Sequence, residues 1–172
     1  MLGKDIFIVS AAIFLLLNCS RTKKEVVEVR HLPIDRLEGI ISLKEVELDQ
    51  EVTSDGNGSL RIDANEPTTV RLYEMADIDI DDARLIYQAR LRSENVDGQV
   101  YLELWCHFAG RGDFYARGLE RPLSGTTDWT TEEAAFLLRE GENPDRVRLN
   151  LVINGTGTAW IDDIHLIAGP LE

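Results

Sequence analysis

Short runs in which hydrophobic and polar residues alternate dominate the chain from about residue 37 onward. In LIYQARLR (residues 85–92), QVYLELWCHF (99–108) and RVRLNLVING (146–155), every second residue is hydrophobic, which predicts β-strands with one buried face. GSLRIDA (58–64) and TTVRLYE (68–74) are shorter runs of the same kind. The residues predicted to point into a core are Leu85, Tyr87, Ala89 and Leu91, then Leu102, Leu104, Cys106 and Phe108, then Val147, Leu149, Leu151 and Ile153.

Clusters of Gly, Asn, Asp and Pro separate these runs, as in DGNGS (55–59), ENVDG (94–98) and EGENPD (140–145). Such residues accept turn geometries, so the pattern is typical of an antiparallel sandwich or barrel. The segment TTEEAAFLLRE (130–140) is compatible with a helix, but its Phe136–Leu138 run favours a strand. We therefore predict an all-β domain with no long amphipathic helix.

The first 18 residues have the composition of an export signal. A lysine lies near the start, and a hydrophobic run of about 12 residues follows, which is short for a membrane span. The run ends in LLNC, which resembles the lipobox of bacterial lipoproteins, although Asn18 departs from the usual small residue. The resemblance implies a lipoprotein signal peptide over 1–18 and lipidation of Cys19; an ordinary signal peptide and an uncleaved anchor are the alternatives.

Residues 19–36 are polar, contain Pro33 and lack a sustained period, so we expect a lipidated N-terminus and tether with one extended segment. Ser20 follows the cysteine in place of the aspartate that marks inner-membrane retention. This favours the outer membrane as the location within a bacterial cell envelope. Cys106 would then have no disulfide partner and is interpreted as a small buried hydrophobic residue.

The formal net charge of −13 argues against a nucleic-acid partner and against electrostatic docking on anionic lipid. It does not identify a ligand. The exported part is long enough for a single domain with a substantial core, which we place at 37–172.

The order of LEGI (37–40), SDGNGSLRI (54–62), GTTDWT (125–130) and GTAWIDDIHL (157–166) resembles the galactose-binding-like jelly-roll superfamily, which includes many carbohydrate-binding modules. The resemblance covers residues 37–168 and implies an antiparallel jelly-roll β-sandwich. Because members of such a fold serve different functions, it predicts the fold more strongly than the ligand.

Many similar modules hold a structural calcium ion between their first and last strands. By resemblance, the ligands here would be Glu38, Asp55, the Gly58 region and Asp162. Calcium takes six to eight oxygen ligands and tolerates irregular geometry. Alternation places Asp162 on one face with Trp160, Ile164 and Leu166, where an unpaired carboxylate would be costly. The alternative is that Asp162 caps backbone amides of the Gly58 turn or pairs with an arginine, without metal. Asp163 is expected to be solvated.

A candidate ligand-binding face follows from the residues that alternate with the core positions. It consists of Tyr101, Glu103, Trp105 and His107, with Arg90, Arg148 and Asn150 on neighbouring strands. Aromatic rings stack on sugar rings, and charged and amide groups bond to sugar hydroxyls. Burial of Trp105 under a loop and a protein-binding surface are the alternatives.

No nucleophile elbow, zinc-ligand pair or phosphate loop occurs, and Glu103 is the single obvious acid on this face, so we expect no enzyme activity. His31 and His165 have no metal-ligand spacing. The leading prediction is a membrane-anchored, non-catalytic binding module, most plausibly for carbohydrate. The alternative is a structural or protein-interaction lipoprotein whose partner is another envelope protein.

Overall fold

The computed structural model describes residues 25–171, and these residues form strands without a helix. Within this range, therefore, no helix could cross a membrane. The expected signal peptide and Cys19 lie outside the described residues. The strands are β1 (Val27–Leu32), β2 (Val46–Asp49), β3 (Ser59–Ala64), β4 (Thr68–Ala76), β5 (Ala83–Phe108), β6 (Gly112–Arg117), β7 (Leu123–Leu138) and β8 (Arg146–Gly169). The prediction of an all-β, antiparallel jelly-roll sandwich is confirmed.

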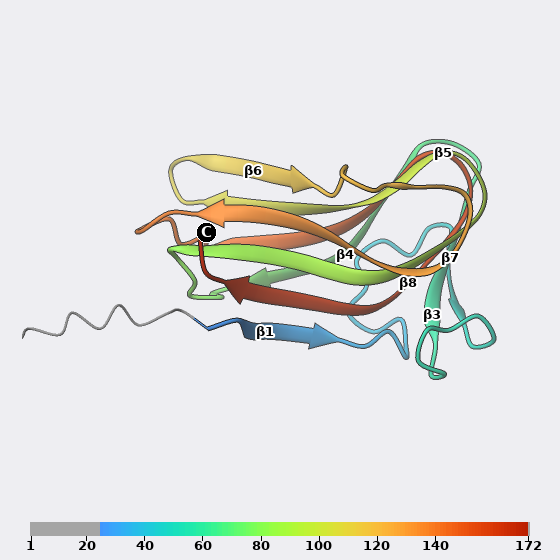
Figure 1. The fold of residues 1–172 in the computed structure, drawn as a ribbon, viewed down its shortest axis with the longest axis horizontal. Coiled ribbons are helices and arrows are strands. Elements are labelled where there is room, and N and C mark those ends of the chain that lie inside the picture. The colour runs from blue at the N-terminus through green and yellow to red at the C-terminus, as the bar shows by residue number, and fades with distance from the viewer. Residues whose placement is uncertain (1–24, 172) are drawn as a thin grey trace, which may run out of the picture.

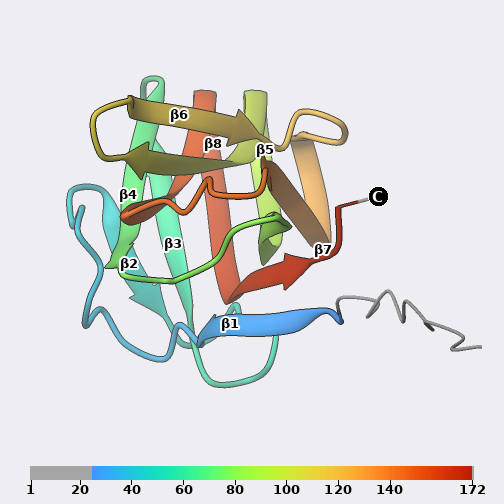
Figure 2. The same ribbon diagram turned by 90° about the vertical axis from the view of Figure 1, so that its left-hand side faces the viewer.

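Two long strands, β5 and β8, pair antiparallel to each other along almost their whole length, from Arg84 opposite Gly169 to His107 opposite Arg146. Both strands bend sharply at the same end of the molecule and pass from one layer to the other, so each contributes to both layers of the sandwich (Figure 1). The first half of β5 and the second half of β8 lie with β7, β1 and β3, while β2 pairs with β3. The other halves lie with β6 and β4 (Figure 2).

The hydrophobic core lies between the two layers, and the predicted inward positions occupy it. All twelve are buried: Leu85, Tyr87, Ala89, Leu91, Leu102, Leu104, Cys106, Phe108, Val147, Leu149, Leu151 and Ile153. Burial raises the pKa of the Cys106 thiol to about 12, so this cysteine is an unreactive packing residue, as predicted.

The segment ENVDG does not form a turn between two strands. Residues 85–92 and 99–108 belong to the single strand β5, and the pairing register with β8 shifts between Glu94 and Asp97. Asn95 and Gly98 have positive φ angles of 53° and 129°. These angles bend the strand without reversing it, so the two runs follow each other end to end instead of lying side by side.

Glycines allow the two backbones to approach closely at this bend. A Cβ on Gly155 would lie 1.9 Å from the Asp97 carbonyl oxygen, and one on Gly98 would lie 2.2 Å from the Asn154 carbonyl oxygen. Both contacts are far inside van der Waals distance. The corner therefore requires residues without a side chain.

The sheet begins earlier in the chain than expected. β1 lies inside the segment 19–36, which was predicted to be a tether with one extended segment, and it pairs with β8 from Val27 opposite Ala168 to Leu32 opposite Ile164. Ile34, directly after β1, is fully buried. The ordered domain thus starts ahead of Leu37, because Val29 and Leu32 pack against the core.

We expect Gly155→Ala to lower the free energy of unfolding by at least about 3 kcal/mol, because the new Cβ meets backbone and the φ of 153° is unfavourable for alanine. Chemical denaturation measures this change. Gly141→Ala is the control, since its φ is 78° but no atom lies near its Cβ; it should cost about 1 kcal/mol. An equal decrease in the free energy of unfolding in the two variants would contradict the conclusion that no side chain fits at Gly155.

Candidate ligand-binding face

The outer surface of the layer formed by β4, β8, β5 and β6 carries the predicted site residues of β5. Their core-facing neighbours are buried, so the pleat places Tyr101, Glu103, Trp105 and His107 on the side away from the core. Tyr101 and Glu103 are nevertheless buried, with exposures of 8% and 5%, and only Trp105 and His107 are partly exposed. We call this surface the binding face. Three rows of side chains cross it: Arg117–Glu103–Asn150–Arg71, Tyr115–Trp105–Arg148–Glu74, and Asp113–His107–Arg146.

The Trp105 indole lies on this face but is not an open platform. Its ring is 4.9 Å from the Tyr115 ring on β6, and the Arg148 guanidinium lies over it at 5.2 Å. The leading prediction made Trp105 part of an open aromatic platform, and coverage by a loop was the alternative. The indole is instead covered by side chains of the two neighbouring strands. The exposed ring of the face is that of Tyr115, with half of its surface open to solvent.

Glu103 is almost completely buried at the centre of the face. Its carboxylate accepts hydrogen bonds from Trp105 Nε1 at 2.6 Å, Arg117 Nε at 2.7 Å and Asn150 Nδ2 at 3.2 Å. Burial raises the pKa of Glu103, but these three hydrogen bonds and the Arg117 charge outweigh it, so the pKa lies below its ordinary value. Glu103 is therefore an ionised anchor that fixes the positions of its three neighbours.

Two polar atoms of the face lack a partner in the described part of the chain. The buried Asn150 Oδ1 accepts no hydrogen bond, and the buried Arg148 Nε donates none. Buried polar groups are rarely left in this state without water or ligand. Beside Arg148 is a hollow of about 20 Å³, enough for little more than one water molecule. It is lined by Glu74, Trp105, His107, Asp113, Arg146 and Arg148.

His107 pairs with a residue outside the predicted set. Its Nδ1 lies 2.6 Å from Asp145 Oδ1, and this hydrogen bond holds the pKa of Asp145 below its ordinary value. Asp145 precedes β8, and its backbone amide donates to the His107 carbonyl oxygen. The pair closes the end of the face near β4.

Arg90 does not join the face. It is part of the first half of β5, where it opposes Asp162 of β8, and its guanidinium donates to Thr131 Oγ1 and the Trp129 carbonyl of β7. The sequence interpretation placed Arg90 beside Trp105 because it treated β5 as two adjacent strands. The face instead receives Arg71, Arg117 and Tyr115 from β4 and β6.

The alternation in β8 changes phase at Asp163. Asp162 to His165 on β8 match Gln88 to Arg90 on β5, so β8 has one extra residue, and Asp163 has a φ of 48°. This β-bulge lets both Ile161 and Ile164 enter the core. Asp162 therefore shares a side of the sheet with Trp160. The prediction from alternation alone, which placed Ile164 and Leu166 on that side too, was wrong for these two residues.

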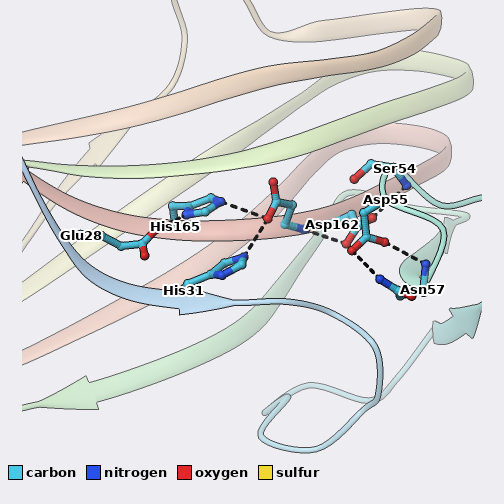
Figure 3. A network of polar contacts seen from close by, with 8 residues as sticks. Glu28, His31, Ser54, Asp55, Asn57, Asp162 and His165 are labelled. Atoms are coloured by element: carbon cyan, nitrogen blue, oxygen red, sulfur yellow. Dashed lines mark hydrogen bonds and ion pairs between the residues drawn. The ribbon is translucent and has the colours of Figure 1, made fainter.

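The residues expected to bind calcium each contact different partners in this structure. The buried Asp162 carboxylate accepts the backbone amides of Ser54 at 2.9 Å and of Asp163 at 2.7 Å, beside the loop that carries Asp55 (Figure 3). Asp55 bonds to Asn57 in its own turn, and the exposed Glu38 pairs with Arg36. Gly58 has a buried backbone in this loop. These contacts match the capping role that was the alternative for Asp162; calcium binding stays a prediction.

The fold is similar to that of solved carbohydrate-binding modules. The CBM22-1 xylan-binding domain from Paenibacillus barcinonensis Xyn10C aligns with a TM-score of 0.62 and 10% identity, covering 87% of this chain and 99% of that domain. The CBM22-1–GH10 modules of Clostridium thermocellum xylanase 10B in complex with xylohexaose align with a TM-score of 0.60 and 11% identity, covering 84% of this chain and 29% of that one. No protein family and no curated protein matches the sequence. At these identities, the similarity defines the fold.

We expect Glu103→Gln to lower the free energy of unfolding by about 2 kcal/mol at pH 7, because a neutral amide weakens the contacts with Arg117 and Trp105. The folded pKa of Glu103 is below the ordinary 4.5, so its ionisation stabilises the fold above that value and loses this effect as pH falls through the folded pKa. Denaturation at pH 7 and below pH 4.5 should therefore show a difference that narrows in acid. The exposed Glu74→Gln serves as control; a pH-independent difference for Glu103→Gln would contradict the assignment.

We expect Asp162→Ala to lower the free energy of unfolding by about 2–4 kcal/mol, since the amides of Ser54 and Asp163 lose their acceptor. Asp162→Asn, which keeps an oxygen acceptor, should cost less. Because both carboxylate oxygens are already bonded, added calcium should leave the Tm of the metal-stripped wild type unchanged. A Tm that rises with calcium in the wild type and not in Asp162→Ala would instead establish the predicted calcium site.

Proposed function

We propose that the protein is a non-catalytic module that binds carbohydrate on the binding face. The observation that carries the proposal is that the same face has the exposed Tyr115 ring and two buried polar atoms without partners, Asn150 Oδ1 and Arg148 Nε. This combination of an aromatic surface and unmet hydrogen bonds is what a sugar ring with its hydroxyl groups requires.

Tyr115 would supply the stacking surface for the C–H face of a sugar. Trp105 supports the Tyr115 ring from the neighbouring strand, and its own indole N–H is committed to Glu103. Arg148 and the exposed Arg71 project from the two strands on the other side of Glu103 and offer guanidinium donors to hydroxyl or carboxylate groups. The face is shallow, so it suits an extended chain better than an enclosed single sugar.

The fold similarity supports the same class of ligand. One aligned domain is described as xylan-binding, and a second aligned structure, which also contains a GH10 module, was solved with xylohexaose. Xylohexaose is therefore the first probe for this protein. Glycans with uronic acid groups are a second probe, because the face has several arginines in a chain whose net charge is −13.

We further propose that the domain is anchored through lipid on Cys19 to the bacterial cell envelope, with the outer membrane as the preferred site. The support is the LLNC sequence with Ser20 after the cysteine. β1 starts at Val27, so only residues 20–26 would separate the lipid from the sheet. Seven residues span at most about 24 Å, which keeps the domain near the membrane surface.

Docking on another envelope protein is the second candidate function. A hollow of about 280 Å³ at the rim of the sandwich is lined by Phe108, Phe114, Phe136 and Leu137, with Arg111 beside them. Phe114 and Leu137 are exposed by 40% and 60%. Exposed aromatic and aliphatic side chains next to an arginine are typical of protein-binding surfaces.

We expect Tyr115→Ala to weaken binding of xylohexaose, or of the best glycan in an array, by about tenfold or more, without loss of stability. Phe114→Ala is the matched control, because the adjacent residue on β6 points to the opposite side and has similar exposure. Isothermal titration calorimetry measures both variants.

If only Phe114→Ala loses binding, the ligand site is the hollow at the rim of the sandwich and not the binding face. Absence of binding to all glycans by the folded wild type would overturn the carbohydrate proposal in favour of protein docking.

A further inference from the structure

Two histidines that are far apart in the sequence meet beside Asp163 on the outer side of β1 and β8. His31 and His165 face each other across the strand pair, with stacked rings 4.3 Å apart. Both Nε2 atoms bond to the same oxygen, Asp163 Oδ1, at 2.8 Å for His31 and 3.0 Å for His165 (Figure 3). This is the one group of three such ligand atoms within 4.8 Å of one another among residues 25–171.

The bulge in β8 sets the side on which this group lies. Ile161 points into the core, so a regular strand continued from it would turn both Asp163 and His165 inward. The extra residue places both on the outer side instead, at the point where the neighbour of β8 changes from β3 to β1. His31 on β1 then completes the group, and Glu28 on the same strand bonds to His165 Nδ1 at 2.6 Å.

The hydrogen-bonding capacities of these groups require a cation. The Glu28 carboxylate only accepts, so the proton of a neutral His165 ring lies on Nδ1 and leaves a lone pair on Nε2. That lone pair lies 3.0 Å from Asp163 Oδ1, which also only accepts. Two acceptors at this distance need a proton or a metal ion between them.

We propose that a divalent transition metal ion, with zinc as the reference ion, binds to His31 Nε2, His165 Nε2 and Asp163 Oδ1. Two imidazoles and one carboxylate suit zinc and its neighbours, whereas calcium prefers oxygen alone. Ligand atoms of a tetrahedral zinc site lie about 3.3 Å apart, close to the two separations given above. Glu28 would act as the outer carboxylate that orients His165 and increases its basicity.

Metal binding requires only small movements. The two rings are parallel, so each must tilt for its lone pair to point at a shared ion. All three side chains are partly exposed, which gives them room to tilt and gives the ion access from solvent. The bound ion would join β1 to β8 through side chains as well as backbone, and it would stabilise the edge of the sheet. This site is independent of the binding face and of carbohydrate.

The test titrates zinc into the whole, metal-stripped chain by calorimetry and follows Tm in parallel. We expect one zinc ion per chain, and a Tm increase of about 5 °C when free zinc exceeds Kd a hundredfold. The double variant His31→Ala/His165→Ala should lose the Tm increase and weaken zinc binding at least a hundredfold. Glu28→Gln should weaken it by about tenfold.

The matched control is His107→Ala, because the chain has three histidines and this one lies on the binding face with Asp145. It should retain zinc affinity and the Tm increase. Cobalt in place of zinc adds a direct readout, since visible absorption of a four-coordinate Co²⁺ ion should depend on His31 and His165. The proposal is overturned if zinc does not raise Tm, if His107→Ala loses as much affinity as the double variant, or if the double variant binds zinc as the wild type does.

Discussion

The pairing of β5 with β8 is the constraint on which the rest of this structure depends. The two strands stay hydrogen-bonded through both layers and bend together at Gly98 and Gly155, where no side chain fits. One half of the pair supports the binding face through Glu103 and Asn150, and the other half supports Asp162 and the histidine pair. Because both sites share the same two strands, each is positioned by a continuous backbone rather than by separate loops.

Buried acidic groups have a consistent role in this acidic protein. Glu103 and Asp162 are almost completely excluded from solvent, and each accepts two or three hydrogen bonds from defined donors. A buried carboxylate that is fully bonded fixes the geometry of its neighbours, whereas an unbonded one would destabilise the fold. Glu103 fixes side chains from three strands, and Asp162 fixes the loop before β3. Two of the acidic residues of this chain thus stabilise its interior through hydrogen bonds.

The sequence predicted most of the longer strands, their inward residues and the alternating set on β5, because a period of two is visible over short windows. It did not predict β2 or β6. It did not predict that residues 85–92 and 99–108 form one strand, and this misplaced Arg90. It missed Asp145, Arg71 and Arg117, which reach the face through cross-strand pairing. The adjacent aromatic residues Phe114 and Tyr115 were the available signal for Tyr115. The pairing of His31 with His165 depends on the registration of β1 with β8, and a single bulged residue sets which side Asp163 takes.

The placement of β1 has a mechanical consequence. Its strand partner in the described part of the chain is β8, and the Val27–Ala168 pair is the first link after residue 25. Tension on the preceding chain enters the domain through these hydrogen bonds. Tension along β1 loads them simultaneously in shear, and tension perpendicular to the sheet opens them one after another from Val27. The direction of pull relative to this strand thus sets how much force the domain withstands before it unravels.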